Sequence, residues 1–148
     1  MMGGLEDKAL KSFEALTKSG VHRKIMRNYY KDKEKSMKKL YLISPYHDDN
    51  LGVMEFRYQC AITAAGQLIA KNYLVFSPIV HCHPIAKEFD LPRDRSFWSE
   101  YDDSFIEWAD LGYVLCITGW DTSEGVTKDI AAFDALGKPV LYSDAQPL

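Results

Sequence analysis

Short apolar runs and longer amphipathic stretches alternate along the chain from residue 40 onward. The runs that are apolar on both faces, which is typical of central strands in a parallel sheet, are 40–44, 73–76, 111–118 and 140–142. The stretches with apolar residues at helical spacing are 51–71, 96–108 and 123–137. The last of these ends at Gly137, a residue type that favours helix C-termini. This alternation predicts an α/β domain in which helices cover both faces of a parallel sheet.

Ligands of such sheets bind outside the carboxyl ends of the strands, where four loops are expected to meet. The loops are 44–50, 77–84, 119–125 and the segment after Tyr142. The third leads into a helix that Thr122 or Ser123 can cap. Gly125 leaves the backbone open there, and free N–H groups suit a phosphate or a sugar hydroxyl, with Asp129 about one to two turns further on. An ordinary capped surface helix is the alternative interpretation.

The segment 79–95 contains VHCHPIAKEFDLPRD, shows no strong periodicity and is expected to be a loop. Its residues His81, Cys82 and His83 are of metal-binding types. Three adjacent residues cannot all reach one tetrahedral ion, however, and no second cluster completes a set of four. No metal site is therefore expected. The imidazoles are expected either to hydrogen-bond a ligand or the local backbone from a flap, or to be satisfied structural groups.

The helix expected over 96–108 carries two adjacent carboxylates, Asp102 and Asp103, in its middle. The residues expected on its inner face are Phe97, Tyr101, Ile106 and Trp108. Asp110 follows the helix and comes directly before the third strand. That position is at the amino end of the sheet, opposite the expected ligand edge.

Charge is distributed unevenly along the chain, whose formal net charge is −3. Residues 1–39 hold 11 Lys and Arg against 5 Asp and Glu, whereas residues 40–148 hold 7 against 16. The acidic main body argues against duplex nucleic acid as a partner. Residues 1–36 form a basic helical extension, interpreted as a solvated surface, an arm for phosphates or a membrane surface, or a segment without a part in the site. Residues 37–148 are the expected domain.

Three features predict a cytoplasmic protein without a membrane partner. No apolar run approaches the roughly 20 residues that a membrane span requires. The N-terminus lacks the apolar region of a secretory signal. The three cysteines, Cys60, Cys82 and Cys116, are widely spaced. Cys60 and Cys116 fall on predicted buried elements as free thiols, which suits a reducing compartment.

Four motifs of the main domain resemble a known family. They are YLISPY at 41–46, FSPIVHCHPIA at 76–86, FW at 97–98 followed by DD and AD, and GWDTSEGVTKDIAAFDALGKPVLY at 119–142. Together they resemble the DUF1937 family of bacterial and phage proteins, which is similar to the nucleoside 2-deoxyribosyltransferase superfamily. The resemblance implies a flavodoxin-like (Rossmann-like) three-layer sandwich with four to five parallel strands. It also implies cleavage or transfer at the N-glycosidic bond of a nucleoside or nucleoside 5′-monophosphate, without a cofactor.

The resemblance assigns roles to individual residues. Asp129 takes the place of the carboxylate that attacks the anomeric carbon, and Ser123 and Gly125 match positions at the substrate's phosphate. The candidates for the acid that protonates the leaving base are Asp103, His83 and Asp110, the last matching a base-handling acidic residue of the superfamily. The further positions expected near the sugar and base are Ser44, Pro45, Tyr46, Ser77, His81 and Trp98.

Two departures from the superfamily pattern leave other functions open. Asp129 stands where the superfamily has Glu, so its carboxylate lies more than about 1 Å further back. Thr127 stands where the superfamily has a second glycine. A module that binds or senses a nucleotide without cleaving it is therefore the alternative, followed by hydrolysis of a nicotinamide dinucleotide and by a purely structural role. Superfamily relatives are dimers or higher oligomers, so the resemblance also implies a homo-oligomer.

Overall fold

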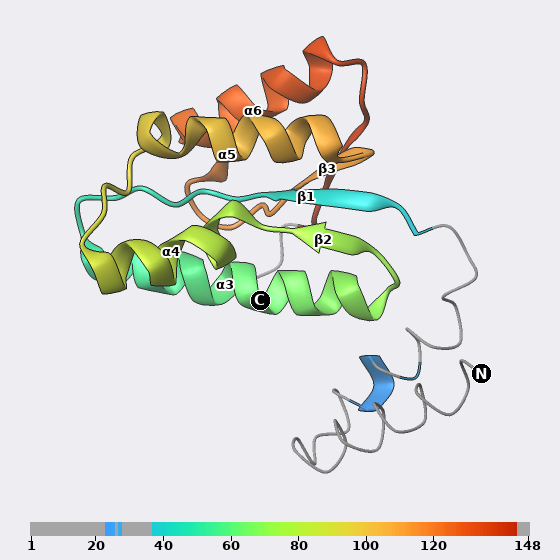
Figure 1. Ribbon diagram of the computed structural model, residues 1–148, viewed down its shortest axis with the longest axis horizontal. Helices are drawn as coiled ribbons and strands as arrows, with labels where there is room; N and C mark the ends of the chain where they lie inside the picture. The colour runs from blue at the N-terminus through green and yellow to red at the C-terminus, as the bar shows by residue number, and fades with distance from the viewer. Residues whose placement is uncertain (1–22, 26, 28–36, 145–148) are drawn as a thin grey trace.

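Strands and helices alternate in the described part of the protein, which comprises residues 23–25, 27 and 37–144 of a computed structural model (Figure 1). The strands are β1 (Lys39–Ile43), β2 (Leu74–Phe76), β3 (Leu111–Val114) and β4 (Val140–Tyr142). The helices from residue 37 onward are α3 (Leu51–Ala70), α4 (Pro78–Phe89), α5 (Arg95–Trp108), the 3-10 helix η1 (Trp120–Thr122) and α6 (Glu124–Ala135). The strands pair in parallel, in the order β2-β1-β3-β4. This confirms the predicted α/β class.

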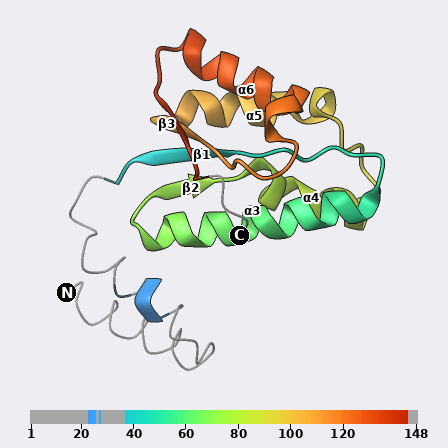
Figure 2. The same cartoon turned by 180° about the vertical axis from the view of Figure 1, so that it is seen from behind.

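Strand β1 lies inside the sheet and divides the core into two layers. Its residues Leu40 and Leu42 pack with α3, whereas Tyr41 and Ile43 pack with α5 and α6. Successive side chains of a strand point to opposite faces of the sheet, so a strand covered on both faces is apolar throughout. Figures 1 and 2 show α3 and α4 on one face and α5 and α6 on the other. The molecule is therefore a flavodoxin-like three-layer sandwich.

Helix α4 corrects the prediction of a loop over 79–95. It begins at Pro78. Proline is favoured at this position because the first N–H of a helix has no acceptor within the helix. The Ser77 hydroxyl caps this start by accepting a hydrogen bond from the Val80 N–H at 3.2 Å. The buried stripe of the helix consists of Ile79, Cys82, His83 and Ala86. The loop prediction was wrong because a cysteine and a histidine belong to this stripe and because Pro84 lies inside the helix.

The buried face of α5 also differs from the prediction. The buried residues are Trp98, Asp102 and Ile106, each four positions apart. Phe97 and Tyr101, which were expected to pack inward, are 49% and 48% exposed. Ile106 is 2% exposed and Trp108 packs against the same core, as expected, so only the first half of the inner face is displaced by one residue. The stripe was not recognised in the sequence because Asp102 interrupts its apolar pattern.

The N-terminal part of the chain stays a matter of prediction. The basic helical extension expected over 1–36 lies outside the described residues except for 23–25 and 27, which are helical. The domain boundary before residue 37 also stays a prediction. Within the described ranges, no helix combines the length and the apolar character needed to cross a bilayer.

The centre of the sheet has no room for an added side chain at Gly112. A Cβ there would lie 3.0 Å from Ile43 Cδ1 and 3.1 Å from Phe133 Cδ2. We therefore expect Gly112→Ala to lower the free energy of unfolding by about 1–3 kcal/mol, through overpacking. Gly66 in α3 has no atom within 4 Å of such a Cβ. The matched control Gly66→Ala should raise the same free energy by about 0.5–1 kcal/mol in urea titrations. Equal effects of the two substitutions would contradict this packing.

Candidate functional site

A pocket of about 570 Å³ opens at the carboxyl ends of β1 and β3. The chain leaves β1 toward β2 on one side of the sheet and leaves β3 toward β4 on the other, so this is the topological switch point where ligands of such folds bind. The lining comes from the β1–α3, α4–α5 and β3–α6 loops and from the helices α3 to α6. The two described residues after β4, Ser143 and Asp144, do not line the pocket, and the Ser143 hydroxyl accepts a hydrogen bond from the Cys116 N–H at 2.8 Å.

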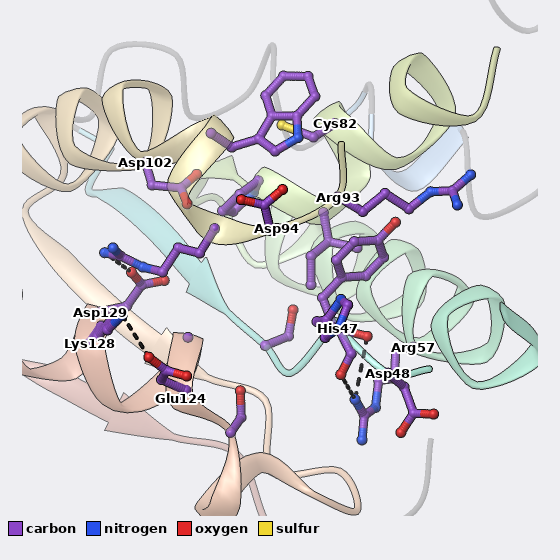
Figure 3. A pocket seen from close by; sticks show the side chains of 18 of the residues that line it. His47, Asp48, Arg57, Cys82, Arg93, Asp94, Asp102, Glu124, Lys128 and Asp129 are labelled. Carbon is purple, nitrogen blue, oxygen red and sulfur yellow. Dashed lines mark hydrogen bonds and ion pairs between the residues drawn. The ribbon is translucent and has the colours of Figure 1, made fainter. Parts of the chain in front are cut away.

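The carboxylate of Asp129 forms part of the pocket wall. Asp129 belongs to the buried stripe of α6 and is 8% exposed. Arg95 Nη2 donates to its Oδ1 at 3.1 Å, as a dashed line in Figure 3 shows, and the Tyr41 hydroxyl donates to its Oδ2 at 3.3 Å. Burial raises the pKa of Asp129, whereas the hydrogen bond and charge of Arg95 act in the opposite direction. The two donors favour the ionised form and fix its orientation.

A second carboxyl, that of Asp102 on α5, lies on the same side of the pocket as Asp129 (Figure 3). It is 6% exposed, and its Oδ1 has no hydrogen-bond partner within the described residues. Burial raises the pKa of Asp102 to about 7, and the negative charge of Asp129 adds to the shift. The pocket thus contains one carboxylate paired with a guanidinium and one carboxyl that retains its proton up to neutral pH. Such a pair can divide nucleophilic and acid roles.

The start of α6 forms another part of the wall. The Ser123 hydroxyl caps the helix by accepting a hydrogen bond from the Val126 N–H at 3.3 Å, so Ser123 and not Thr122 is the cap. The N–H groups of Glu124 and Gly125 have no acceptor among the described residues. A Cβ at Gly125 would meet only the Ser123 hydroxyl, at 3.9 Å, so the backbone borders open space. Free N–H groups at the positive end of a helix dipole suit an anion.

A hydrogen-bonded chain of three side chains belongs to the opposite layer. The Tyr46 hydroxyl and His83 Nδ1 are 2.6 Å apart, and His83 Nε2 lies 2.7 Å from Glu55 Oε2. Tyr46 and His83 line the pocket, while Glu55 on α3 stands behind them with a side chain that is 43% exposed. The ring of Tyr58 stacks on His83 with centroids 4.3 Å apart. Both nitrogens of the imidazole are thus engaged.

Arg57 joins the two loops of the switch point. Its Nη1 donates to the carbonyl oxygens of Tyr46, at 3.3 Å, and His47, at 3.0 Å, in the β1–α3 loop. Its Nη2 would lie only 2.6 Å from a Cβ at Gly119 in the β3–α6 loop. Gly119 also has φ +93°, a conformation that glycine adopts without strain. Figure 3 shows Arg57, His47 and Asp48 across the pocket from Asp129.

The structure brings together a large part of the predicted residue set. The predicted residues that line the pocket are Ser44, Tyr46, His83, Trp98, Ser123, Gly125 and Asp129. Trp98, which was expected near the sugar and base, lines the pocket but is largely covered by protein. It is 8% exposed, its Nε1 donates to the Pro92 carbonyl oxygen at 2.8 Å, and it packs with Cys82 and Ala86 of α4.

The two other predicted acids lie outside the pocket lining. Asp110 Oδ2 accepts a hydrogen bond from the Lys39 N–H at 2.8 Å, at the amino end of β1. This places Asp110 at the edge of the sheet opposite the pocket, as its position before β3 indicated. The Asp103 side chain is 66% exposed and lies 3.8 Å from Arg95. It borders the site without lining it.

Three predicted binding residues have positions that do not present their side chains to the pocket. Ser77 uses its hydroxyl to cap α4. Pro45 is fully buried beneath the β1–α3 loop. His81 is exposed, and its ring lies against Phe76 and Tyr101 at centroid distances of 5.9 and 6.0 Å.

Metal and thiol chemistry find little support in the described residues. They contain no group of three or more His, Cys, Asp or Glu side chains that could hold a metal ion. Cys82 lines the pocket, but burial raises the pKa of its thiol to about 12, and the charge of Asp102 adds to the effect. A thiol that stays protonated is a poor nucleophile.

Comparison with known proteins identifies the family. The model of a family described as "Domain of unknown function (DUF1937)" matches residues 38–144. The chain belongs to the DUF1937 family. No curated protein matches the chain. The family resemblance that the motifs indicated is therefore confirmed, while the relation to the deoxyribosyltransferase superfamily stays a prediction.

Several lining or supporting residues of this DUF1937 domain were missed by the sequence analysis. They are Tyr41, Glu55, Arg57, Arg93, Arg95, Asp102 and Lys128. For Asp102 a signal existed, because it lies midway between Trp98 and Ile106 on one helical stripe. No local sequence signal existed for Arg95, because its partner Asp129 lies 34 positions away in the sequence.

Because the pKa of Asp102 is raised in the fold, the free energy of unfolding should depend on pH. A carboxyl whose pKa is about 7 in the fold and near its ordinary value in the unfolded chain binds more proton when folded, so rising pH destabilises the fold. Relative to Asp102→Asn, the wild-type free energy of unfolding should fall between about pH 4 and 7, by at most about 1.4 kcal/mol per pH unit. Urea titrations across this range measure it. The neighbouring substitution Asp103→Asn, at a 66% exposed side chain whose charge is the smallest of the causes named for Asp102, should change the pH dependence far less. Parallel profiles of wild type and Asp102→Asn would contradict the shift.

Proposed function

We propose that the protein cleaves or transfers the N-glycosidic bond of a nucleoside or nucleoside 5′-monophosphate. The single observation that carries this proposal is that two buried carboxyls, Asp129 and Asp102, line one pocket. Glycosidic bonds are cleaved by two carboxyl groups, of which one attacks or stabilises the sugar and the other donates a proton to the leaving group. In this proposal Asp129 and Asp102 supply these two roles.

Asp129 acts on the sugar. Its Oδ attacks C1′ while the bond from C1′ to the base nitrogen breaks, which gives a sugar ester of Asp129. Arg95 and Tyr41 hold the carboxylate in place through hydrogen bonds of 3.1 and 3.3 Å. A nucleophile fixed by two donors loses little orientational freedom in the transition state.

Asp102 donates a proton to the departing base. With a pKa raised to about 7, it retains that proton up to neutral pH yet releases it readily. Its Oδ1 has no partner among the described residues, so a bound base would satisfy it. Asp102 takes the role that the sequence analysis considered for Asp103, Asp110 and His83.

The 5′ end of the substrate lies at the start of α6. The free N–H groups of Glu124 and Gly125 and the open space above Gly125 suit a 5′-hydroxyl or a phosphate. Lys128, which lines the pocket and pairs with Glu124 at 2.7 Å, supplies positive charge nearby. The volume of about 570 Å³ is within the range of pockets for small ligands.

The second candidate is a module that binds or senses a nucleotide without cleaving it. The observation that favours it is that the Asp129 carboxylate is already occupied by Arg95. The same pocket would then bind the nucleotide, and Asp129 would serve to orient Arg95. This candidate predicts a ligand-induced rise in melting temperature without release of base.

Base release from a panel of nucleosides, their 5′-monophosphates and a nicotinamide dinucleotide tests the proposal. Wild type should release base from at least one of them, as chromatography would show. Asp129→Asn should lower that rate by at least about a hundredfold, because an amide is a poor nucleophile at C1′. The control Asp134→Asn makes the same change at an exposed position of α6 and should keep the wild-type rate. A thermal shift without base release would favour the sensing module, and an unchanged rate in Asp129→Asn would exclude the assigned nucleophile.

Gly125→Ala tests whether the substrate approaches the start of α6. The added methyl group meets no atom closer than the Ser123 hydroxyl at 3.9 Å, so the free energy of unfolding should not fall. The methyl group would occupy space next to the backbone N–H groups. We therefore expect KM to rise about tenfold, equivalent to about 1.4 kcal/mol of binding. Gly66→Ala, the same change in α3 away from the pocket, should leave KM unchanged. An unchanged KM in both variants would remove the 5′ end from this place.

A further inference from the structure

The hydrogen-bonded chain of Tyr46, His83 and Glu55 has no part in the chemistry of Asp129 and Asp102. It joins the pocket to the outer surface of α3 and α4 through contacts of 2.6 and 2.7 Å. His83 is 5% exposed, and its ring is stacked on Tyr58 and set edge-on to Tyr46 at a centroid distance of 5.5 Å. A buried imidazole held by two rings and two hydrogen bonds has one orientation.

The order of protons along this chain follows from its two ends. The hydrogen bond from His83 lowers the pKa of Glu55, so Glu55 is an ionised acceptor. His83 Nε2 therefore carries the proton, and its Nδ1 is left as an acceptor for the Tyr46 hydroxyl. Burial raises the pKa of Tyr46, which keeps the hydroxyl in its neutral form. Because the phenolic proton is directed at Nδ1, the lone pairs of the Tyr46 oxygen are available to accept a proton.

Tyr46 belongs to the same loop as His47 and Asp48, which lie across the pocket from Asp129 in Figure 3. Tyr46 can therefore act on an acceptor molecule that approaches the sugar from the side of the pocket opposite Asp129. The second half of the proposed reaction requires a general base for the water or hydroxyl group that replaces the nucleobase. In glycosidases with two carboxyl groups, the acid of the first half takes that role, so Tyr46 is here a second candidate beside Asp102.

We propose that Tyr46, backed by His83 and Glu55, removes the proton from the acceptor in the second half of the reaction. This inference rests on the proposed function. The acceptor oxygen bonds to C1′ as the ester bond from C1′ to Asp129 breaks, which restores the carboxylate. The acceptor's proton passes to the Tyr46 oxygen while the phenolic proton passes to His83 Nδ1. The resulting imidazolium is stabilised by Glu55, then loses its proton to solvent, and Asp102 regains one from solvent.

A separation of the two half-reactions tests this inference. In rapid-quench experiments with whichever panel substrate wild type cleaves, Tyr46→Phe should still release about one base per chain in the first turnover. Its later steady-state rate should fall about a hundredfold, within the range typical of a lost general base. Intact-mass measurement of the chain should then show the accumulated sugar ester.

Glu55→Gln tests the positioning residue behind the imidazole. The amide oxygen of Gln can still accept the hydrogen bond from His83 Nε2 but lacks the charge that stabilises an imidazolium. The first turnover should again be kept, with a steady-state rate about tenfold lower. The matched control Tyr58→Phe removes a hydroxyl from the ring stacked on His83. It should keep both phases, namely base release in the first turnover and the later steady-state rate. Thermal unfolding of each variant verifies the fold.

The outcomes separate the two proposals. If wild type releases no base from any panel substrate, the proposed function fails and this inference fails with it. If wild type is active but Tyr46→Phe loses both phases equally or keeps both, only the role of Tyr46 is overturned. If Tyr46→Phe loses the second phase while Glu55→Gln matches wild type, the relay behind Tyr46 is overturned.

Discussion

A carboxylate that is almost removed from water has to be paired and hydrogen-bonded, and Asp129 imposes this requirement on the fold. Its two donors come from Arg95 at the start of α5 and from Tyr41 in the middle of β1. Tyr41 is also a core residue, 0% exposed and in contact with the rings of Phe76 and Phe133. One layer of the hydrophobic core and the pocket are therefore joined through a single side chain. The pairing of Arg95 with Asp129 also links α5 to α6.

The alternation of strands and helices could be predicted from the sequence because it depends on long patterns that many residues share. The boundaries of α3 and α5 were close to those expected, and the four strands occurred in the expected places. Strand β3 ends at Val114, earlier than the apolar run through residue 118 indicated. The Leu115 N–H still donates to the Ile43 carbonyl oxygen of β1 at 2.8 Å, whereas Ile117 is buried beyond the end of the strand. An apolar run therefore indicates burial and not strand pairing.

The candidate site was predicted less completely, for one physical reason that recurs on three helices. His83 in α4, Asp102 in α5 and Asp129 in α6 each occupy a position in the buried stripe of their helix. Polar residues in a buried stripe interrupt its apolar periodicity. For this reason α4 was not predicted, and the first half of the inner face of α5 was misplaced by one residue. Asp129 was singled out by its place after the free N–H groups of the helix start, and only its catalytic role came from the family resemblance. Contacts between distant segments, such as that of Arg95 with Asp129, leave no local pattern to find.

The close approach of Arg57 to Gly119 has a consequence for how this protein family can diverge. Any side chain at the position of Gly119 would enter the space of the guanidinium, only 2.6 Å away. The same guanidinium fixes the carbonyl groups of the β1–α3 loop. A lineage that replaces the glycine must therefore also shorten or reorient the residue at position 57, and the loop then loses its anchor. A smaller side chain at position 57, in contrast, would leave Gly119 unhindered but would remove both hydrogen bonds to the loop.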